Sequence, residues 1–294
     1  MARSWSSQPL AMEACIIEYS PPADGYRVLN KTVTGSGKGK GGVSVRLNQS
    51  GQIEVSGSLS SGQRSDSIPC DNPTLFAAAV FRHYLAQAGI PVRGAIRLVS
   101  RKGVLPQPTS DSIVAVYISP PMAEVVKTMM KRSNNHFAEQ VFASVSAIKT
   151  GNGSYRASRA VGDQLLRQAG INPRDVQFED GSGLSRSNAV TPRQMCQLLQ
   201  YMSTHRHANA FIDSLPVAGQ DGTLRGRMGH GNASHKVLAK TGYINNVVCL
   251  SGYLMLNSNQ TLLFSFLVND VKMSTDAVKS TQDKLCDLLS RLNL

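Results

Sequence analysis

Residues 235–268 read HKVLAKTGYINNVVCLSGYLMLNSNQTLLFSFLV, and their apolar runs predict three β-strands. The last two runs are separated by Asn257-Ser258-Asn259-Gln260, which is typical of a hairpin turn, so these strands are expected to pair antiparallel. Residues 274–294 then predict an amphipathic helix, with Leu285, Leu288, Leu289 and Leu292 on one face. An antiparallel sheet covered by a helix indicates the α+β class.

The segment upstream of this sheet is predicted to be mostly helical from Pro121 onward. One apolar stripe precedes Ser133-Asn134-Asn135 and another follows it, which favours a break between two helices at this tripeptide. Residues 155–169 predict a further helix that ends at Gly170. Thr191-Pro192 combines an N-cap residue with proline at the first helical position, so another helix is expected to begin there. Helices are therefore expected to precede the sheet along the chain.

The first part of the chain is rich in Gly and Ser and has short alternating runs. Three runs predict strands: ACIIEYS at 14–20, VSVRL at 43–47 and QIEVSGSL at 52–59. A helix is predicted to begin at Asn72-Pro73 and GAIRLVS, at 94–100, predicts a strand. We therefore expect a small β-rich domain over residues 1–70 and a second domain over residues 71–294. A turn-rich stretch near 106–119 marks another break.

Composition narrows the class of protein. The 294 residues, of which 41% are hydrophobic and 17% charged, indicate a globular protein of one large or two modest domains. No run of 18 apolar residues is present, and the first twenty residues lack the apolar core of a signal peptide. The net charge of +12 favours polyanionic surroundings. Nucleic acid is disfavoured as a partner, because no basic block is interleaved with aromatic residues.

Two patterns that suggest cofactors are set aside. Residues 37–42 match G-x-G-x-x-G, but an alternating strand follows them where a dinucleotide-binding fold needs a helix. The histidine pairs His205/His207 and His230/His235 lack helical i, i+4 spacing, and the five cysteines contain no C-x-x-C. We therefore expect no cofactor and no metal site.

The tripeptide Ser133-Asn134-Asn135 is the first element that suggests chemistry. If it lies in a turn between two helices, Ser133 and Asn135 face one cleft together. A hydroxyl relays a proton and an amide binds a substrate carbonyl, so this pair suits a peptide substrate. Taken alone, the tripeptide is better explained as an ordinary interhelical turn.

The second element is Lys240-Thr241-Gly242 on the first predicted strand of the sheet. Lys240 and Gly242 share one face of that strand, and a glycine leaves room for a ligand beside the lysine cation. The cation suits a carboxylate, and an extended peptide pairs readily with an edge strand. Taken alone, this element is also compatible with a strand lysine before a tight turn.

The order Ser-x-Asn and then Lys-Thr-Gly resembles that of the serine acyl-transferases that react with penicillin. DGSGLSR at 180–186 and LPVAGQDGTL at 215–224 are similar to segments of one subgroup, the D-Ala-D-Ala carboxypeptidase/endopeptidases of the penicillin-binding protein 4 type. The resemblance extends from about Asn72 to Val271. Before residue 70 it is faint and consistent with the inserted β-rich domains of that family.

This resemblance implies a fold, a reaction and partners. The fold is an antiparallel sheet flanked by helices, β-lactamase/transpeptidase-like and incomplete here. The reaction is attack by a serine on peptidoglycan stem peptides, with β-lactams as inhibitors, in the periplasm or cell envelope. Catalytic residues would be Ser133, Asn135 and Lys240, and Thr241 and Gly242 would bind substrate. Asp180 and Ser182 are interpreted as structural, with the aspartate bonding its own backbone.

One departure from the family pattern is serious. The family's nucleophile lies in a Ser-x-x-Lys motif upstream of Ser-x-Asn, and no such motif precedes Ser133 here. The single Ser-x-x-Lys, Ser146-Ala147-Ile148-Lys149, follows Ser133 and is interpreted as a coincidence. We therefore expect the segment carrying the nucleophile to be absent and the chain to pair with a complementary N-terminal segment or with itself. The alternative is a non-catalytic peptidoglycan-binding or regulatory remnant of the family.

Overall fold

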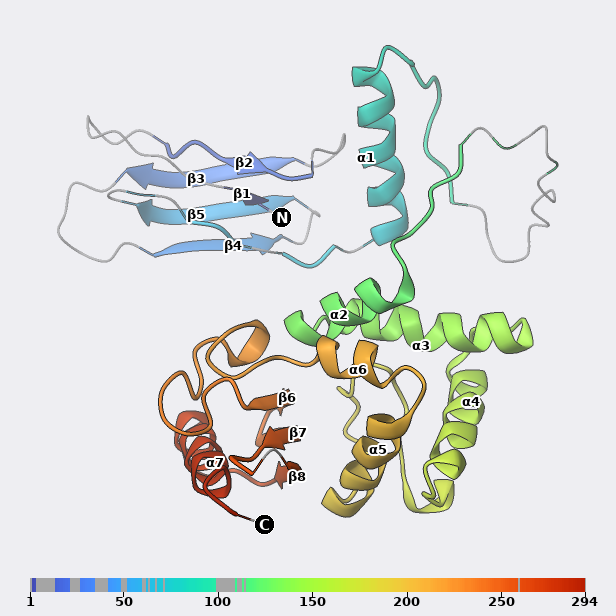
Figure 1. Ribbon diagram of the computed structural model, residues 1–294. Helices are drawn as coiled ribbons and strands as arrows, with labels where there is room; N and C mark the ends of the chain where they lie inside the picture. The colour runs from blue at the N-terminus through green and yellow to red at the C-terminus, as the bar shows by residue number, and fades with distance from the viewer. Residues whose placement is uncertain are drawn as a thin grey trace. The chain divides into compact units, whose positions relative to one another are not determined.

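The computed structural model describes residues 2–3, 14–21, 27–34, 42–48, 52–59, 62, 64–66, 68–70, 72–98, 109, 113, 115–258 and 260–293 (Figure 1). The chain forms two compact units, Met1–Val114 and Ala115–Leu294. The division falls in the turn-rich stretch near 106–119, later than the boundary expected after residue 70, because helix α1 (Pro73–Gln87) belongs to the first unit. The domain assignment at 1–70 and 71–294 stays a prediction.

Among its described residues, the first unit contains two small sheets. Strand β1 (Ala2–Arg3) pairs antiparallel with β2 (Glu18–Tyr19). In the second sheet β5 (Ile53–Leu59) lies between β3 (Val28–Thr34), its parallel partner, and β4 (Val43–Leu47), its antiparallel partner. Buried Cys15, Val43 and Val55 form its core. The small buried set explains why this unit has little apolar periodicity in its sequence.

Sequence-based expectations in this unit were only partly correct. Strands over 43–47 and 52–59 are confirmed, as is the helix after Asn72, whose side chain accepts a hydrogen bond from Leu75 N. The strand expected over 94–100 was wrong for the described residues 94–98, and only Glu18–Tyr19 of 14–20 is a strand. Strand β3 was missed because Asn30 and Lys31 interrupt its apolar alternation. The glycine-rich residues 37–41 and the turn residues 106–108 lie outside the described residues.

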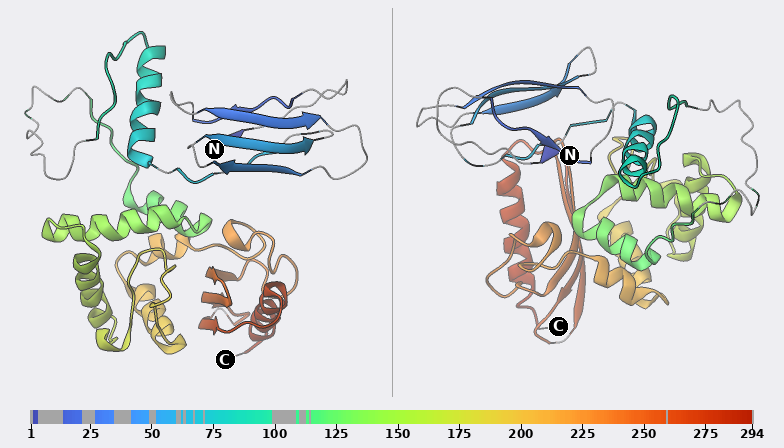
Figure 2. Two further views of the ribbon diagram at one scale, coloured as in Figure 1. Left: turned by 180° about the vertical axis from the view of Figure 1, so that it is seen from behind. Right: turned by 90° about the horizontal axis from the view of Figure 1, so that it is seen from above.

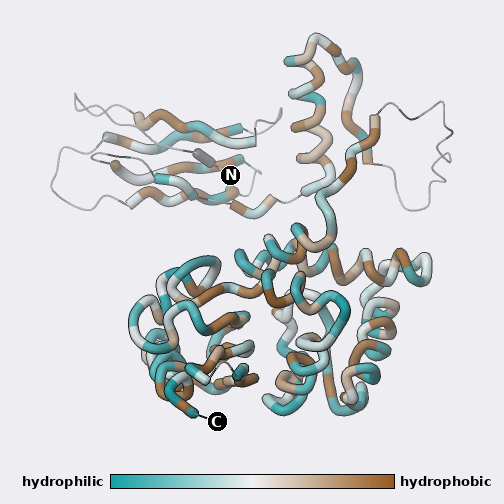
Figure 3. Tube along the Cα trace, in the orientation of Figure 1, coloured by the Kyte–Doolittle hydropathy of each residue, from teal (hydrophilic) through white to brown (hydrophobic). Residues whose placement is uncertain are grey.

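The second unit is built on a three-stranded antiparallel sheet. Its order is β6 (Val237–Ile244), β7 (Val247–Met255) and β8 (Thr261–Val268), as the apolar runs predicted. Lys240 lies opposite Ser251, and Gly242 lies opposite Cys249. The central strand β7 is the most buried, with Leu250 and Leu254 fully inaccessible to solvent. Figure 3 shows hydrophobic residues along these strands.

Helices cover both faces of this sheet (Figures 1 and 2). Helix α7 (Thr275–Leu289) packs on one face, where Cys286 joins the main buried cluster. Helices α5 (Pro192–Thr204) and α6 (Ala208–Ser214) lie on the other face, where Leu199, Leu215 and Tyr253 form a second cluster. The Tyr253 hydroxyl donates to Leu199 O at 2.7 Å, so its polar end is satisfied inside the core. The expected α+β class is confirmed.

Three further helices and two short 3₁₀ turns complete the second unit. Helices α2 (Met122–Arg132) and α3 (Asn135–Thr150) are separated at Ser133-Asn134, as predicted, and α4 (Tyr155–Gln168) packs on α3. The 3₁₀ turns are η2 (Pro173–Asp175) and η3 (Gly222–Leu224). Among the helices that the structure describes, none is long and apolar enough to cross a membrane.

Candidate functional site

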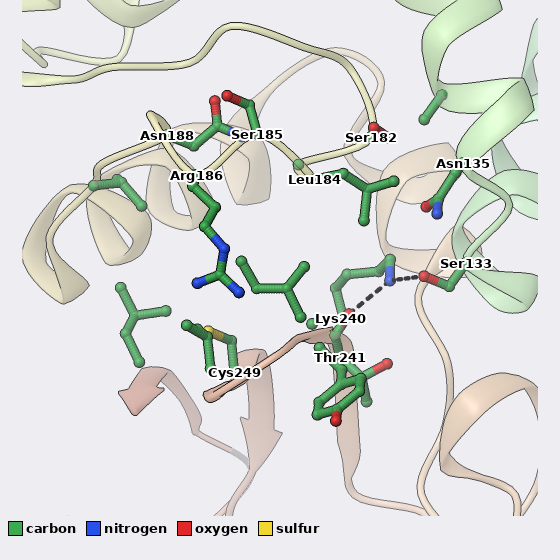
Figure 4. Close-up of a pocket in the computed structure, with 18 of the residues that line it drawn as sticks. Ser133, Asn135, Ser182, Leu184, Ser185, Arg186, Asn188, Lys240, Thr241 and Cys249 are labelled. Carbon is green, nitrogen blue, oxygen red and sulfur yellow. Dashed lines mark hydrogen bonds between the residues drawn. The ribbon is translucent and has the colours of Figure 1, made fainter. Parts of the chain in front are cut away.

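The break between α2 and α3 directs two polar side chains into one cleft. Ser133 follows α2 in the left-handed conformation, with φ 51° and ψ 52°, which reverses the chain direction. Asn134 then caps α3, because its side chain accepts from Phe137 N at 3.0 Å. Asn135 is the first residue of α3, and its amide lies beside Ser133 in Figure 4. The exposed Ser133 and Asn135 therefore face the same cleft.

Strand β6 brings Lys240 to the same place. Lys240 Nζ donates to Ser133 Oγ at 2.7 Å and to Thr241 O at 2.7 Å. Thr241 Oγ1 donates to Thr223 Oγ1 at 2.8 Å. The Thr223 hydroxyl accepts this bond, so its own proton is available to another acceptor. One ammonium group and three hydroxyl groups are thus clustered at the end of α2 and the edge of the sheet.

Burial changes the acidity of this lysine. Desolvation lowers the pKa of Lys240 from 10.5 to about 8, because its ammonium group has lost much of its water. At neutral pH most of the population remains charged. A small fraction is nevertheless neutral, so the side chain is suited both to attract an anion and to exchange a proton with Ser133.

The outer edge of β6 is partly occupied by the chain itself. Ala218 N donates to Val237 O at 2.9 Å, and Ala239 N donates to Pro216 O at 3.0 Å. Backbone groups of alternate residues in a strand point to the same side. The backbone of Thr241 and Tyr243 is therefore expected to point outward into the cleft, where an extended peptide is able to pair with it.

A loop over residues 180–186 forms the opposite rim of the cleft. Asp180 accepts hydrogen bonds from Gly183 N at 2.9 Å, Ser185 N at 2.7 Å and Asn188 Nδ2 at 2.9 Å. Burial opposes ionisation of Asp180, but these bonds outweigh it and hold its pKa below the ordinary value. The structure shows the expected bonds of Asp180 to its own backbone loop, and its structural role stays a prediction.

Glu139 attaches this loop to α3, one helical turn beyond Asn135. Its carboxylate accepts from Ser182 N at 2.9 Å and from Gly181 N at 3.3 Å. Burial raises the pKa of Glu139, but the bonds from Ser182 and Gly181 more than compensate and lower it overall. Gly181 is required at this contact, since a Cβ there would lie 2.5 Å from Ala138 O. The rim is therefore fixed against the helix that carries Asn135.

The cleft between these elements has a volume of about 1010 Å³. All five residues expected from the sequence line it: Ser133, Asn135, Lys240, Thr241 and Gly242. Gly242 lies beside Cys249 in the cleft, and an added Cβ there would lie 3.3 Å from the Cys249 Cβ, a tight contact. The structure brings the expected residues together, and their individual roles stay predictions.

Thr223 and Glu139 were missed by sequence reasoning. Thr223 lies in the segment 215–224 that carries part of the family resemblance, yet no role was assigned to it. The spacing of four residues between Asn135 and Glu139, on one face of a helix, was the available signal for the second. In the described part of the chain, no group of three or more His, Cys, Asp or Glu residues is arranged to hold a metal ion.

Ser146 does not lie in the cleft. It is fully buried between α3 and α4, where its hydroxyl bonds to Ala143 O at 3.0 Å and to Ser158 Oγ at 2.8 Å. Lys149 is exposed one turn later. A nucleophile needs access to substrate, so the burial of Ser146 supports the interpretation of its Ser-x-x-Lys pattern as a coincidence.

Solved structures share this fold. The crystal structure of penicillin binding protein 4 from Haemophilus influenzae, complexed with a β-lactam, aligns with a TM-score of 0.75 and 22% sequence identity. The alignment covers 99% of this chain and 69% of that one. At this level of identity the likeness shows the fold alone, and it confirms the α+β architecture expected from the sequence.

Sequence comparison assigns the family. The chain is 33% identical over 246 residues to a D-alanyl-D-alanine carboxypeptidase of Actinomadura sp., covering 79% of this chain and 44% of that protein. It is 30% identical over 207 residues to D-alanyl-D-alanine carboxypeptidase DacB of Haemophilus influenzae, covering 69% and 42% respectively. The chain thus spans less than half the length of these curated relatives. The family model for D-Ala-D-Ala carboxypeptidase 3 (S13) matches residues 8–292, and the chain belongs to that family.

Proposed function

We propose that this chain forms the carboxylate-binding and proton-relay half of the active site of a serine-type D-Ala-D-Ala carboxypeptidase/endopeptidase. The observation that carries the proposal is the contact of 2.7 Å between Lys240 Nζ and Ser133 Oγ, which joins the two motif elements in one cleft. Membership of the S13 family supplies the substrate class, a peptidoglycan stem peptide ending in D-Ala-D-Ala. A location in the periplasm or cell envelope, where peptidoglycan lies, is part of this proposal.

Each cleft residue suits one part of such a substrate. The terminal carboxylate is attracted by the Lys240 ammonium and accepts a hydrogen bond from the pair of hydroxyls that Thr241 forms with Thr223. The Asn135 amide bonds to the substrate backbone, and the edge of β6 at Thr241–Tyr243 pairs with the extended peptide. Gly242 leaves room for this approach. Ser133 passes a proton between the reacting groups and Lys240.

The reaction has two steps. A serine Oγ attacks the carbonyl carbon of the penultimate D-Ala, the C–N bond to the terminal D-Ala breaks, and the serine proton is passed to the leaving amine. Water then hydrolyses the serine ester, which restores the hydroxyl and releases the shortened peptide. A β-lactam follows the first step, with its ring amide in place of the peptide bond, and forms an acyl-enzyme.

The attacking serine is proposed to come from a segment other than residues 115–293. Within the printed sequence Ser-x-x-Lys occurs once, at the buried Ser146, and the cleft beside Ser133 and Lys240 is large for a dipeptide. Met129, Met130 and Leu267 give part of its lining an apolar character suited to packed protein. A complementary segment with Ser-x-x-Lys, or a second copy of the chain, would occupy this space.

Reversible binding tests the proposal without requiring the nucleophile. We expect the isolated chain to bind an acetylated D-Ala-D-Ala dipeptide, measured by calorimetry or by NMR titration, and Lys240→Met to abolish this binding. Lys236→Met is the matched control, because Lys236 precedes β6 and bonds to Asn257 instead of facing the cleft. Absence of binding by the wild-type chain, or equal loss in both variants, would contradict the proposal.

A fluorescent penicillin separates the two forms of this function. We expect no covalent adduct with the chain alone, and an adduct on the added segment when one carrying Ser-x-x-Lys complements it. The alternative of a non-catalytic peptidoglycan-binding remnant is favoured only by the lack of that motif before Ser133. It predicts dipeptide binding with no adduct under either condition. An adduct on Ser146 would overturn the assignment of that residue as structural.

A further inference from the structure

Lys131 and Asp221 form an ion pair beside the cleft. Lys131 Nζ lies 2.6 Å from Asp221 Oδ2 and 2.9 Å from Asp221 Oδ1, although the two residues are 90 positions apart. The side chains are 16% and 32% exposed, so the pair is partly shielded from solvent. Lys131 belongs to the last turn of α2, and Asp221 is the N-cap of η3. The pair therefore joins a helix to the loop that runs along β6.

Each residue of the ion pair lies two positions before a residue whose hydroxyl lines the cleft. Ser133 follows Lys131 by two residues, and Thr223 follows Asp221 by two residues. Ser133 Oγ accepts a hydrogen bond from Lys240 Nζ, and Thr223 Oγ1 accepts one from Thr241 Oγ1. Because Lys240 and Thr241 are neighbours on β6, the contacts close into a ring. Its members are Lys131, Ser133, Lys240, Thr241, Thr223 and Asp221.

The loop side of this ring is firmly attached to the sheet. Asp221 Oδ1 accepts from Val217 N at 2.9 Å, and the neighbouring Ala218 N donates to Val237 O of β6 at 2.9 Å. Gly222 has a φ of +57°, and an added Cβ there would lie 2.7 Å from Lys131 O. The loop thus packs directly against the backbone of the last turn of α2, where a side chain would separate them.

The α2 side of the ring depends more on the ion pair. Ser133 lies in a left-handed turn after the helix end, so its hydroxyl position follows any shift of the last turn. Burial disfavours the charged form of Asp221, but the bonds from Lys131 and Val217 outweigh it and lower the Asp221 pKa. The carboxylate therefore stays ionised at neutral pH and holds Lys131 in place.

We propose that Lys131 and Asp221 are positioning residues, which hold the Ser133 and Thr223 hydroxyls on either side of Lys240-Thr241 so that all four groups converge on one ligand. This inference rests on the proposed function for the identity of the ligand, a peptide carboxylate. In the ring Thr223 becomes an additional carboxylate-binding residue, since its hydroxyl accepts from Thr241 and retains its own proton for the ligand.

The test removes the charge of Asp221 with little change of shape. We expect Asp221→Asn to weaken binding of the acetylated D-Ala-D-Ala dipeptide about tenfold, as for other residues that couple to a site through a contact network. Lys131→Met should have the same effect, and it gives a second disruption of the pair should the first variant not fold. Lys131→Arg keeps the ion pair and should retain most of the wild-type affinity.

A second readout does not depend on any ligand. Competitive labelling of lysines with acetic anhydride, followed by mass spectrometry across a pH series, reports the pKa of Lys240. In the wild-type chain burial sets this pKa at about 8. When the ring opens, water reaches the ammonium group, so the pKa should rise toward 10.5 in Asp221→Asn and remain low in Lys131→Arg.

Asp283→Asn is the matched control. It breaks the Arg227–Asp283 pair, which also spans distant residues at 2.6 Å, with side chains 13% and 25% exposed, and it lies outside the cleft. Both variants should lower the melting temperature by a similar amount. Only Asp221→Asn should change dipeptide affinity and the Lys240 pKa. Equal effects of the two variants on the cleft, or none from Asp221→Asn, would overturn the positioning role.

The two readouts separate this inference from the proposed function. If the wild-type chain does not bind the dipeptide, the proposed function fails, and the pKa of Lys240 alone decides whether the ion pair shapes the cleft. If the wild-type chain binds and Asp221→Asn binds equally well, the function stands and the positioning role is rejected.

Discussion

Lys240 has a long, flexible side chain whose ammonium group is largely desolvated. Its ammonium group reaches the Ser133 hydroxyl at 2.7 Å, and burial lowers its pKa to about 8. A lysine in bulk water is charged throughout the physiological range, so it attracts anions but does not exchange protons readily. In this cleft the pKa of Lys240 is close enough to neutral pH for the residue both to attract an anion and to exchange a proton.

This shift gives the cleft a measurable pH dependence. A carboxylate ligand needs the charged form of Lys240, and the free chain loses that proton as the pH rises through about 8. We expect the association constant of the acetylated dipeptide to be level between pH 6 and 7. It should then fall about tenfold per unit well above pH 8. Calorimetry in buffers from pH 6 to 10 measures this profile.

Lys240→Arg provides the control for the pH profile. Arginine remains charged across the whole range, so any binding that this variant retains should vary little between pH 7 and 10. A wild-type profile that stays level to pH 10, or one that the arginine variant reproduces, would show that another group titrates.

At the level of single residues, sequence patterns located the motif residues but not their supports. Ser133, Asn135 and Lys240 lie in recognisable tripeptides, and the structure places all three in one cleft. Glu139 and Thr223 act through partners 43 and 18 positions away. No local pattern encodes such contacts, because they depend on how helices and loops pack in three dimensions.

Among the elements, long periodic segments were predicted well. The three strands of the main sheet and helices α4, α5 and α7 follow clear apolar patterns with caps, such as the Thr191–Gln194 capping box of α5. Helix α6, with seven residues, was missed because a helix this short has little intrinsic stability. It exists through its packing on α2 and α5, which the local sequence does not show.

Ser146, on helix α3, allows a test of how the role of a buried serine differs from that of Ser133. Ser146 is buried between α3 and α4, so its hydroxyl serves packing, whereas Ser133 faces the cleft. We expect Ser146→Ala to lower the free energy of unfolding by about 1 kcal/mol, from the loss of a buried hydrogen bond. Binding of the dipeptide should be unchanged. Urea denaturation and calorimetry measure the two effects.

Ser144→Ala serves as the reference for this experiment. Ser144 is exposed on the same helix, so its replacement should change neither stability nor binding. Loss of dipeptide binding in Ser146→Ala at unchanged stability would mean that the buried serine takes part in the site.

On the scale of the whole molecule, charge is the dominant feature. The chain carries a net charge of +12, which favours weak association with polyanions such as DNA or anionic cell-wall polymers at low salt. Such association is carried by many exposed cations at once and is strongly screened. Recognition in the cleft involves one partly buried lysine and is screened much less.

Salt therefore separates general attraction from specific recognition. We expect retention on immobilised DNA to be lost by about 0.5 M NaCl, whereas retention on peptidoglycan sacculi persists and is displaced by free D-Ala-D-Ala dipeptide. Co-sedimentation with sacculi and elution from a DNA column, in the same salt series, give this comparison. Stronger salt resistance on DNA than on sacculi would instead favour a nucleic-acid partner.

The left-handed backbone of Ser133 has a consequence for how this protein tolerates change. At φ 51° a glycine or asparagine is accommodated more easily than a serine. A residue with a side chain is less stable there than glycine by about 1 kcal/mol. A laboratory selection for heat resistance alone would therefore tend to replace this serine, because relief of the backbone strain opposes the loss of a single hydrogen bond, the one that its hydroxyl accepts from Lys240 Nζ. A lineage that keeps it gives up some stability for the role proposed for this hydroxyl in the cleft. The residue found at position 133 after heat selection would therefore indicate whether the function of the cleft was also under selection.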